Sequence, residues 1–194
     1  NTPLLDFFHD LPAMLKVART EEVTTTRLDD VPELDGVTCD FLKLDIQGAE
    51  LGALRNGERV VGDALVIHTE VEFAPLYRDQ PLFSDVDGYL RSQGFGFHTF
   101  ASFGAGSFNR TQTTPESCLT YNNLLWADAV YVRDFSSFDS LPPERLLKLA
   151  AILHEVYRSY DLCHLALTEY DRVSEESLAV VYVDNLRQIE QHHI

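Results

Sequence analysis

The stretch from Cys39 to Glu50, which reads CDFLKLDIQGAE, constrains the fold of this chain more than any other part of the sequence. Its apolar run from Phe41 to Ile46 has the length of a β-strand, and the charges of Lys43 and Asp45 interrupt that run. A charge in a buried strand costs free energy unless it is paired or lies at the open end of the strand. The stretch therefore predicts a buried strand with an acid at its tip.

A turn and a helix are predicted directly after this strand. Gln47 and Gly48 break the apolar run, and a helical pattern begins at Ala49. Glu50 falls in the first helical turn, where the helix dipole favours a negative charge. In open parallel sheets, ligands bind beyond the carboxyl ends of the strands. We therefore expect this strand end to border a ligand crevice, and Gln47 either points into the crevice or only satisfies the turn backbone.

Strands and helices alternate along the middle of the chain. Residues 51–60 predict a helix with Asn56-Gly57 within it or at its end, and the apolar run from Ala64 to Phe73 predicts a second strand that is covered on both faces. A further helix is predicted over residues 82–90, with Gly94 placed to end it. Such alternation is typical of a parallel sheet.

Two later strands are connected differently. Residues 95–100 and 124–132 both predict strands, and residues 101–123 between them are rich in Gly, Ser, Thr and Asn. A long loop without a helix indicates that these two strands pair antiparallel at an edge of the sheet. Nearer the start of the chain, β-branched residues alternate over residues 22–28 and predict one more strand.

Residues 140–194 predict a helical appendage. Pro142 and Pro143 suit the first turn of a helix, and apolar residues then recur at helical spacing in three segments. We therefore expect two domains, an α/β domain over residues 1–139 and a helical extension over residues 140–194.

The charge of the chain limits its partners. The formal net charge of the 194 residues is −16, which repels nucleic-acid phosphates and anionic lipid head groups, so we expect no nucleic acid and no membrane among the partners. No apolar run reaches the ~20 residues of a membrane-spanning helix. Cys39, Cys118 and Cys163 are odd in number and far apart, which indicates a reducing compartment and hence a cytoplasmic location.

The span from Asp40 to Arg133 resembles the FkbM-type methyltransferases, which use S-adenosylmethionine. The matching blocks are FLKLDIQGAE at 41–50, EVEF at 70–73, PLY at 75–77, QPLF at 80–83 and GF at 94–95, preceded by TRLDD at 26–30. The resemblance implies an α/β fold with the Rossmann-like sheet of class I methyltransferases. In that sheet, the opening stretch is the fourth strand, residues 64–73 are the fifth, and the two later strands form the antiparallel edge.

The chain differs from this family in the residues that bind the cofactor. The family's glycine-rich turn after the first strand cradles the methionine part of S-adenosylmethionine, and an acid after the second strand binds the ribose. Residues 1–39 supply neither feature, and the chain begins at Asn1 rather than at a methionine. We therefore expect the N-terminal strands of the sheet to be encoded upstream, and the cofactor-binding residues are left unassigned.

The resemblance implies methyl transfer to a hydroxyl of a small-molecule or sugar-like acceptor. Such a reaction needs a positioned acceptor and a base that takes its proton. Asp45 and Glu70 are the candidate catalytic acids, because the ends of neighbouring strands lie ~4.8 Å apart. Gln47, Glu72 and Tyr77 are the candidate substrate-binding residues. No spacing typical of metal ligands stands out, so we expect no metal; a metal held by Asp45 and Glu70 is the alternative.

Other roles stay open for these residues. Lys43 with Glu70, or Asp45 with His68, would form structural ion pairs, and His68 and Trp126 are expected in the core. For the whole chain, the alternative is a non-catalytic fragment or interaction module derived from a methyltransferase, with partner contacts through the C-terminal helices. A different Rossmann-like nucleotide enzyme is a third hypothesis. No pattern in the sequence predicts the oligomeric state.

Overall fold

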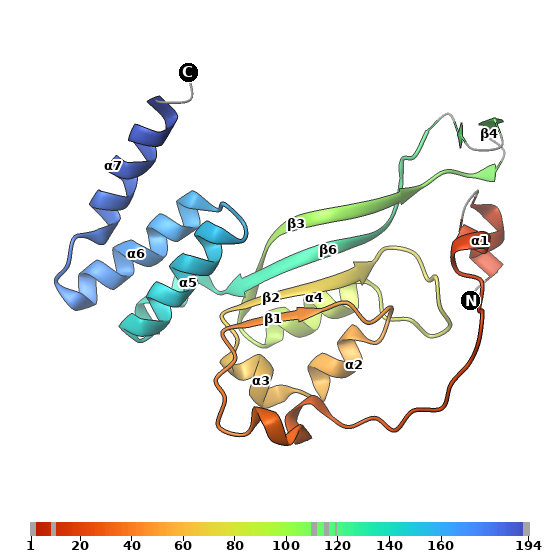
Figure 1. The fold of residues 1–194 in the computed structure, drawn as a ribbon, viewed down its shortest axis with the longest axis horizontal. Coiled ribbons are helices and arrows are strands. Elements are labelled where there is room, and N and C mark those ends of the chain that lie inside the picture. The colour runs from red at the N-terminus through yellow and green to blue at the C-terminus, as the bar shows by residue number, and fades with distance from the viewer. Residues whose placement is uncertain (1–2, 9–10, 110–111, 115–116, 119, 192–194) are drawn as a thin grey trace.

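The computed structural model describes residues 3–8, 11–109, 112–114, 117–118 and 120–191, which form a four-stranded mixed sheet with helices around it (Figure 1). The strands of this sheet are β1 Phe41–Leu44, β2 Val66–Glu72, β3 Phe95–Gly106 and β6 Asn123–Arg133. A second sheet pairs β4 Gln112–Thr114 with β5 Ser117–Cys118. The α-helices are α1 Leu11–Met14, α2 Glu50–Arg55, α3 Glu58–Asp63, α4 Phe83–Ser92, α5 Pro143–Glu155, α6 Tyr160–Ser174 and α7 Leu178–Gln191. The 3-10 helices are η1 Pro3–Phe7, η2 Leu28–Asp30, η3 Pro32–Leu34 and η5 Phe135–Ser140.

The order of the strands in the main sheet is β1-β2-β6-β3. β1 and β2 run parallel, with Leu44 opposite Thr69 at the end of the register. β6 lies between β2 and β3 and runs antiparallel to both. The predicted antiparallel pairing of the two later strands is therefore confirmed.

One face of the sheet is covered by α2, α3 and α4. Alternate residues of β2 point to opposite faces, and Ile67 and Val71 share this one. They are completely buried among the apolar side chains of the three helices. Tyr89 of α4 donates a hydrogen bond of 3.1 Å from its hydroxyl to the carbonyl of Leu54, which ties α4 to α2. This layer of helices packs against the face of the sheet that carries Ile67 and Val71.

The opposite face is divided between a core and a polar region. At one end, Val66, Val130 and Val132 pack against α5 and α6 in a second apolar core. Towards the other end, β2 presents His68, Glu70 and Glu72 on the same face, which follows from the two-residue period of a strand. The helices therefore cover this face only at the amino ends of β1 and β2.

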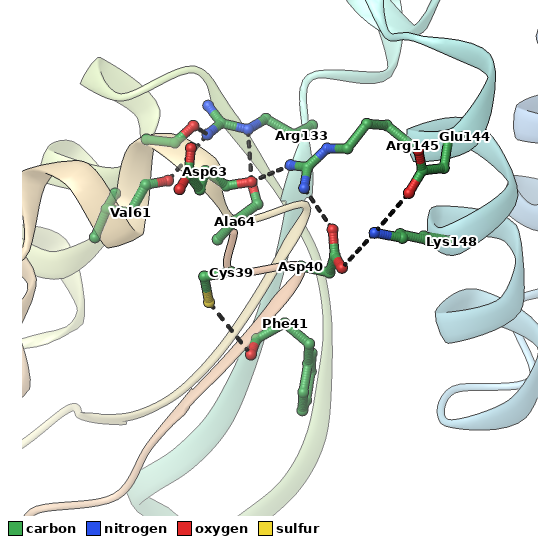
Figure 2. A network of polar contacts seen from close by, with 11 residues as sticks. Cys39, Asp40, Phe41, Val61, Asp63, Ala64, Arg133, Glu144, Arg145 and Lys148 are labelled. Carbon is green, nitrogen blue, oxygen red and sulfur yellow. Dashed lines mark hydrogen bonds and ion pairs between the residues drawn. The ribbon is translucent and has the colours of Figure 1, made fainter. Parts of the chain in front are cut away.

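A polar network fixes α5 to the start of β1 (Figure 2). Asp40 accepts a hydrogen bond from Arg145 Nη1 and pairs with Lys148 Nζ at 3.1 Å. Arg145 also donates to the carbonyl of Asp63. Arg133 reaches the backbone nearby, because its Nε donates to the carbonyl of Ala64 at 2.8 Å. The network joins the end of α3, the starts of β1 and β2, and the first turns of α5.

The opposite end of the sheet is covered by an N-terminal segment, which we define as residues 3–8 and 11–15. Leu5, Phe8 and Leu11 are buried with Leu76 and Leu125 in a third apolar core. Phe8 also stacks on Phe108, with the ring centroids 5.0 Å apart. Figure 1 shows α1 at the end of the molecule towards which β1 and β2 point, and α5 to α7 at the other end. The N-terminal segment thus lies beyond the carboxyl ends of the parallel strands.

Two predictions about the elements were wrong, and one open alternative is decided. Residues 22–28 form no strand; they are largely exposed, run without regular structure and enter η2 at Leu28. Of the two alternatives for Asn56-Gly57, the one in which the pair ends the helix is confirmed, since α2 ends at Arg55 and α3 begins at Glu58. β3 continues to Gly106, into residues expected to be a loop, because β6 supplies a pairing partner along its length.

The C-terminal helices begin at Pro143, as the sequence predicts. The division into domains at residues 139 and 140 stays a prediction. Among the described residues, none of the helices combines the length and the apolar character that crossing a membrane requires. The cytoplasmic location also stays a prediction.

Candidate functional site

The turn between β1 and α2 is held by the acid that begins the helix. Gln47 and Gly48 have φ of 56° and 99°, in the left-handed region. Glu50 is 2% exposed, and its two carboxylate oxygens accept hydrogen bonds from the backbone N–H groups of Ile46 at 2.7 Å and Gly48 at 2.8 Å. The two bonds stabilise a turn that an L-residue at position 47 disfavours. The prediction of Glu50 as an anion at a helix start is confirmed, and the structure adds that it shapes the turn.

The side chain of Gln47 joins three of the predicted site residues. Its Nε2 donates to Asp45 Oδ1 at 3.1 Å and to Glu70 Oε2 at 2.9 Å. Its Oε1 accepts from the hydroxyl of Tyr77 at 3.3 Å. Gln47 therefore points into the crevice, where it bridges the ends of β1 and β2 and the loop that follows β2.

Glu72 completes the set of predicted residues. It lies two positions after Glu70 on the same face of β2, opposite Trp126 of β6, and it is 3% exposed. Glu72, Glu70, Gln47 and Tyr77 all line one pocket, and Asp45 adjoins it through its bond to Gln47. The structure thus brings all five predicted residues together, while their roles in catalysis or binding stay predictions.

The pocket has a volume of about 180 Å³. Five of its lining residues are apolar and were missed by the sequence reasoning: Leu11, Met14, Leu15, Leu76 and Trp126. Trp126 lies on the face of the sheet that carries Glu72, so it faces the pocket instead of being fully enclosed in the core. The other missed residues come from the N-terminal segment and from the loop after β2.

Gln80 is another residue whose role the sequence did not reveal. It is buried, and its Oε1 accepts hydrogen bonds from the backbone N–H groups of Leu76 at 2.9 Å and Tyr77 at 3.0 Å. A Cβ on Gly48 would lie 2.8 Å from Gln80 Nε2. Gln80 therefore fixes the loop that carries Tyr77 and packs against the turn that carries Gln47.

The acids of the pocket have raised pKa values. Burial, followed by the charge of Asp45, raises the pKa of Glu70 from 4.5 to about 7. Burial, followed by the charge of Glu50, raises the pKa of Glu72 from 4.5 to about 8. Burial and the charge of Glu70 also raise the pKa of Tyr77. Near neutral pH, Glu70 can therefore both accept and release a proton, as a general base requires.

Neither of the structural ion pairs considered from the sequence forms. Lys43 Nζ lies 3.6 Å from Asp45 Oδ2 in an exposed pair, which contributes little stability. His68 Nδ1 is hydrogen-bonded to the hydroxyl of Tyr157 at 3.0 Å, and its Nε2 lies 3.4 Å from Asp128 Oδ1. Burial lowers the pKa of His68. His68 therefore lies between the sheet and the C-terminal helices, as expected of a structural histidine.

Neither a metal-binding cluster nor a glycine-rich turn is found among the described residues of the pocket. In the described part of the chain, no group of three or more His, Cys, Asp or Glu is arranged to hold a metal ion. The turn after β1 has one glycine, and its open side is filled by Gln80. The described residues around the pocket therefore form no glycine-rich cradle for S-adenosylmethionine.

Comparison with known proteins identifies one family. Residues 8–97, just under half of the chain, match the family model described as the methyltransferase FkbM domain. This range contains β1, β2, α4 and all five predicted site residues. No curated protein and no solved structure matches the chain. Residues 8–97 are thus similar to a methyltransferase domain, and the mixed α/β architecture with its four-stranded sheet is consistent with such a fold.

Proposed function

We propose that this chain, with its FkbM methyltransferase match over residues 8–97, carries the acceptor side of an S-adenosylmethionine-dependent O-methyltransferase. The observation that carries the proposal is the contact of one amide, that of Gln47, with both Asp45 and Glu70. These acids lie at the carboxyl ends of two parallel strands, where open α/β sheets bind ligands. One of them, Glu70, has a pKa of about 7.

In the proposed reaction, these residues remove the hydroxyl proton of the acceptor. The acceptor oxygen forms a bond to the methyl carbon, the sulfur–carbon bond of the sulfonium donor breaks with its electron pair kept by sulfur, and the hydroxyl proton leaves. Glu70 or Asp45 takes this proton as general base. Gln47 orients both carboxylates by donating to each of them.

Glu72 and Tyr77 are proposed to bind the acceptor. Glu72 has a pKa of about 8 and carries a proton near neutral pH, so it donates a hydrogen bond to an acceptor oxygen. Tyr77 offers its hydroxyl beside Gln47. S-adenosylmethionine supplies the methyl group, and we assign no residue of this chain to its binding.

The test measures methyl transfer from S-adenosylmethionine to a panel of hydroxyl compounds by mass spectrometry. Asp45→Asn and Glu70→Gln are expected to reduce the rate by about 10²-fold or more, because each removes a candidate proton acceptor. Glu33→Gln is the matched control, since Glu33 is an exposed acid outside the pocket. It should leave the rate unchanged.

Two results would contradict the proposal. If neither acid variant changes the rate, the acids are not the base. If the full-length folded protein transfers no methyl group to any compound, the alternative of a non-catalytic module with partner contacts through residues 140–194 is favoured.

A further inference from the structure

The pocket has a polar side and an apolar side, which come from different parts of the chain. Gln47, Glu70 and Glu72 form the polar side on the strand ends of the sheet. Leu11, Met14, Leu15, Leu76 and Trp126 form the apolar side. Because Trp126 lies beside Glu72 on the sheet, polar and apolar groups adjoin in the pocket, and an acceptor there contacts both.

The apolar side is a fixed part of the fold. Leu11 is 5% exposed and belongs to the third apolar core, together with Leu5, Phe8 and Leu76. Trp126 is held over Gly104 of β3, where a Cβ would lie 2.0 Å from the indole ring atom Cε2. Only glycine at position 104 leaves room for the indole in this position. The indole and Leu11 are thus held by packing against the rest of the fold.

The charge around the pocket limits the acceptor further. Glu70 and Glu72 line it, and the charge of Glu50 acts on both of them. Among the described residues that line the pocket, none is Lys, Arg or His. A phosphate or carboxylate on the acceptor would meet no cation among these lining residues and would be repelled by whichever of the acids is ionised.

We propose that the acceptor is an uncharged alcohol with an apolar aryl or alkyl body, whose body lies against Met14, Leu15 and Trp126 and whose hydroxyl faces Glu70 and Glu72. The identity of the reacting group rests on the proposed function. A sugar carries hydroxyl groups on most of its carbons, and those facing the apolar side would lose their hydrogen bonds to water without replacement. An apolar body gains from the same contact, because it leaves water.

Trp126 provides a direct measurement, because it is the only tryptophan of the chain and lines the pocket. Its fluorescence is followed while the full chain is titrated with four probes: benzyl alcohol, cyclohexanol, methyl glucoside and 4-(hydroxymethyl)benzoate. The first two are expected to give a saturable change in emission. The glucoside and the benzoate should bind at least about 10-fold more weakly, because one leaves hydroxyl groups unpaired and the other brings a negative charge.

Met14→Ser tests the position of the apolar body. Met14 is 66% exposed, so its replacement should not impair folding, and it is expected to weaken benzyl alcohol binding severalfold. Val17→Ser is the matched control, since Val17 is 69% exposed on the same part of the chain and does not line the pocket. It should bind the alcohol as the wild type does.

The outcomes separate this inference from the proposed function. Equal or tighter binding of the glucoside, an unchanged affinity in Met14→Ser, or no response to either apolar alcohol would overturn the inference. If the alcohols bind as expected but none of them is methylated, the proposed function fails and the acceptor preference of the pocket stands. If sugars are the better methylated substrates, the function stands and the inference fails.

Discussion

Gln47 determines how the acids of the pocket are arranged. It sits in the left-handed region with a φ of 56°, where most side chains are disfavoured, and Glu50 holds the backbone there through Ile46 and Gly48. The side chain then reaches Asp45 and Glu70 together. An amide is suited to this place because its two N–H groups can serve two carboxylates at once.

The pH dependence of methyl transfer should follow the ionisation of Glu70. With a raised pKa of about 7, Glu70 is protonated below neutral pH and cannot accept the proton of the acceptor. We expect kcat/KM to rise with pH and to reach half of its maximum near pH 7. In Gln47→Met, the amide that donates to Glu70 is lost. Because this donor favours the charged form of Glu70, its loss should raise the pKa and move the midpoint of the kcat/KM profile to higher pH. A wild-type profile that is flat across neutral pH would contradict this assignment.

Glu72 should make the folded state less stable as the pH rises. Its pKa is about 8 in the folded state and 4.5 for the ordinary group, so the folded state holds a proton that the unfolded chain releases between these values. Its contribution is therefore most favourable below about pH 4.5 and is lost as the pH rises towards 8. Glu72→Gln stays neutral and should lose less stability over this range.

Urea unfolding near pH 5 and near pH 9 measures this difference. At ~1.4 kcal/mol per pKa unit, the free energy of unfolding of the wild type should fall by up to a few kcal/mol more than that of Glu72→Gln between the two conditions. Equal losses in both proteins would show that Glu72 titrates normally.

At the scale of elements, the strand–turn–helix of residues 41–55 is the unit that places the site. β1 and β2 supply the acids, and the first turn of α2 supplies Glu50, which fixes the turn between β1 and α2. Helix α2 is therefore more than a cover for the sheet, because its first residue determines where Gln47 points.

Glu50→Ala should disrupt this unit. It removes two charge-assisted hydrogen bonds from a buried position, and we expect a loss of ~2–4 kcal/mol in the free energy of unfolding, together with reduced methyl transfer. Glu58→Ala is the matched control, since Glu58 is an exposed acid in the first turn of α3. Its effect should stay within ~0.5 kcal/mol. Chemical denaturation of the two variants makes the comparison, and equal losses would argue against a special role of Glu50.

The sequence alone predicted those strands and turns whose residue pattern is local. The apolar run of β2 is readable because both faces of the strand are covered, and the break at Gln47 and Gly48 marks the turn. Residues 22–28 have strand-like alternation, but a strand also needs a pairing partner, which no local pattern reveals. β3 extends through Gly104 because β6 lies beside it, although the composition there is typical of a loop.

The same reason explains which parts of the site were predicted. Asp45, Gln47, Glu70, Glu72 and Tyr77 lie at or just after strand ends, where the topology itself brings them together. Leu11, Met14 and Leu15 reach the pocket through tertiary contacts of a segment that begins far from β2 in the sequence. Their apolar spacing does not differ from that of ordinary core residues, so the sequence gives no sign of their place.

At the scale of the whole molecule, the C-terminal helices are joined to the sheet by a shared core and by the network around Asp40. Val66, Val130 and Val132 are almost fully buried under α5 and α6, and Figure 2 shows Arg145 and Lys148 directed towards Asp40. The end of the sheet opposite the pocket therefore depends on these helices for its burial.

Arg145→Met should destabilise the whole chain. It leaves Asp40 with Lys148 as its remaining cationic partner and removes the donor to the carbonyl of Asp63, so we expect a loss of ~1–3 kcal/mol on urea unfolding. Arg187→Met is the control, because the pair of Arg187 with Asp184 is exposed on α7. Its removal should change the stability by less than ~1 kcal/mol. Similar losses in both variants would show that the network around Asp40 adds no stability beyond that of a surface pair.

The N-terminal segment is connected to the rest of the chain by residues 16–27, which are exposed and carry no regular structure. Two of the side chains proposed to contact the body of the acceptor, Met14 and Leu15, therefore lie on a different stretch of sequence from the acids proposed to take its proton. Substitutions at positions 11–15 can change the preferred substrate while the acids remain intact. Under the proposed function, acceptor preference and proton transfer can therefore be altered by substitutions at separate positions, and a library confined to positions 11–15 is an economical way to change the preferred acceptor.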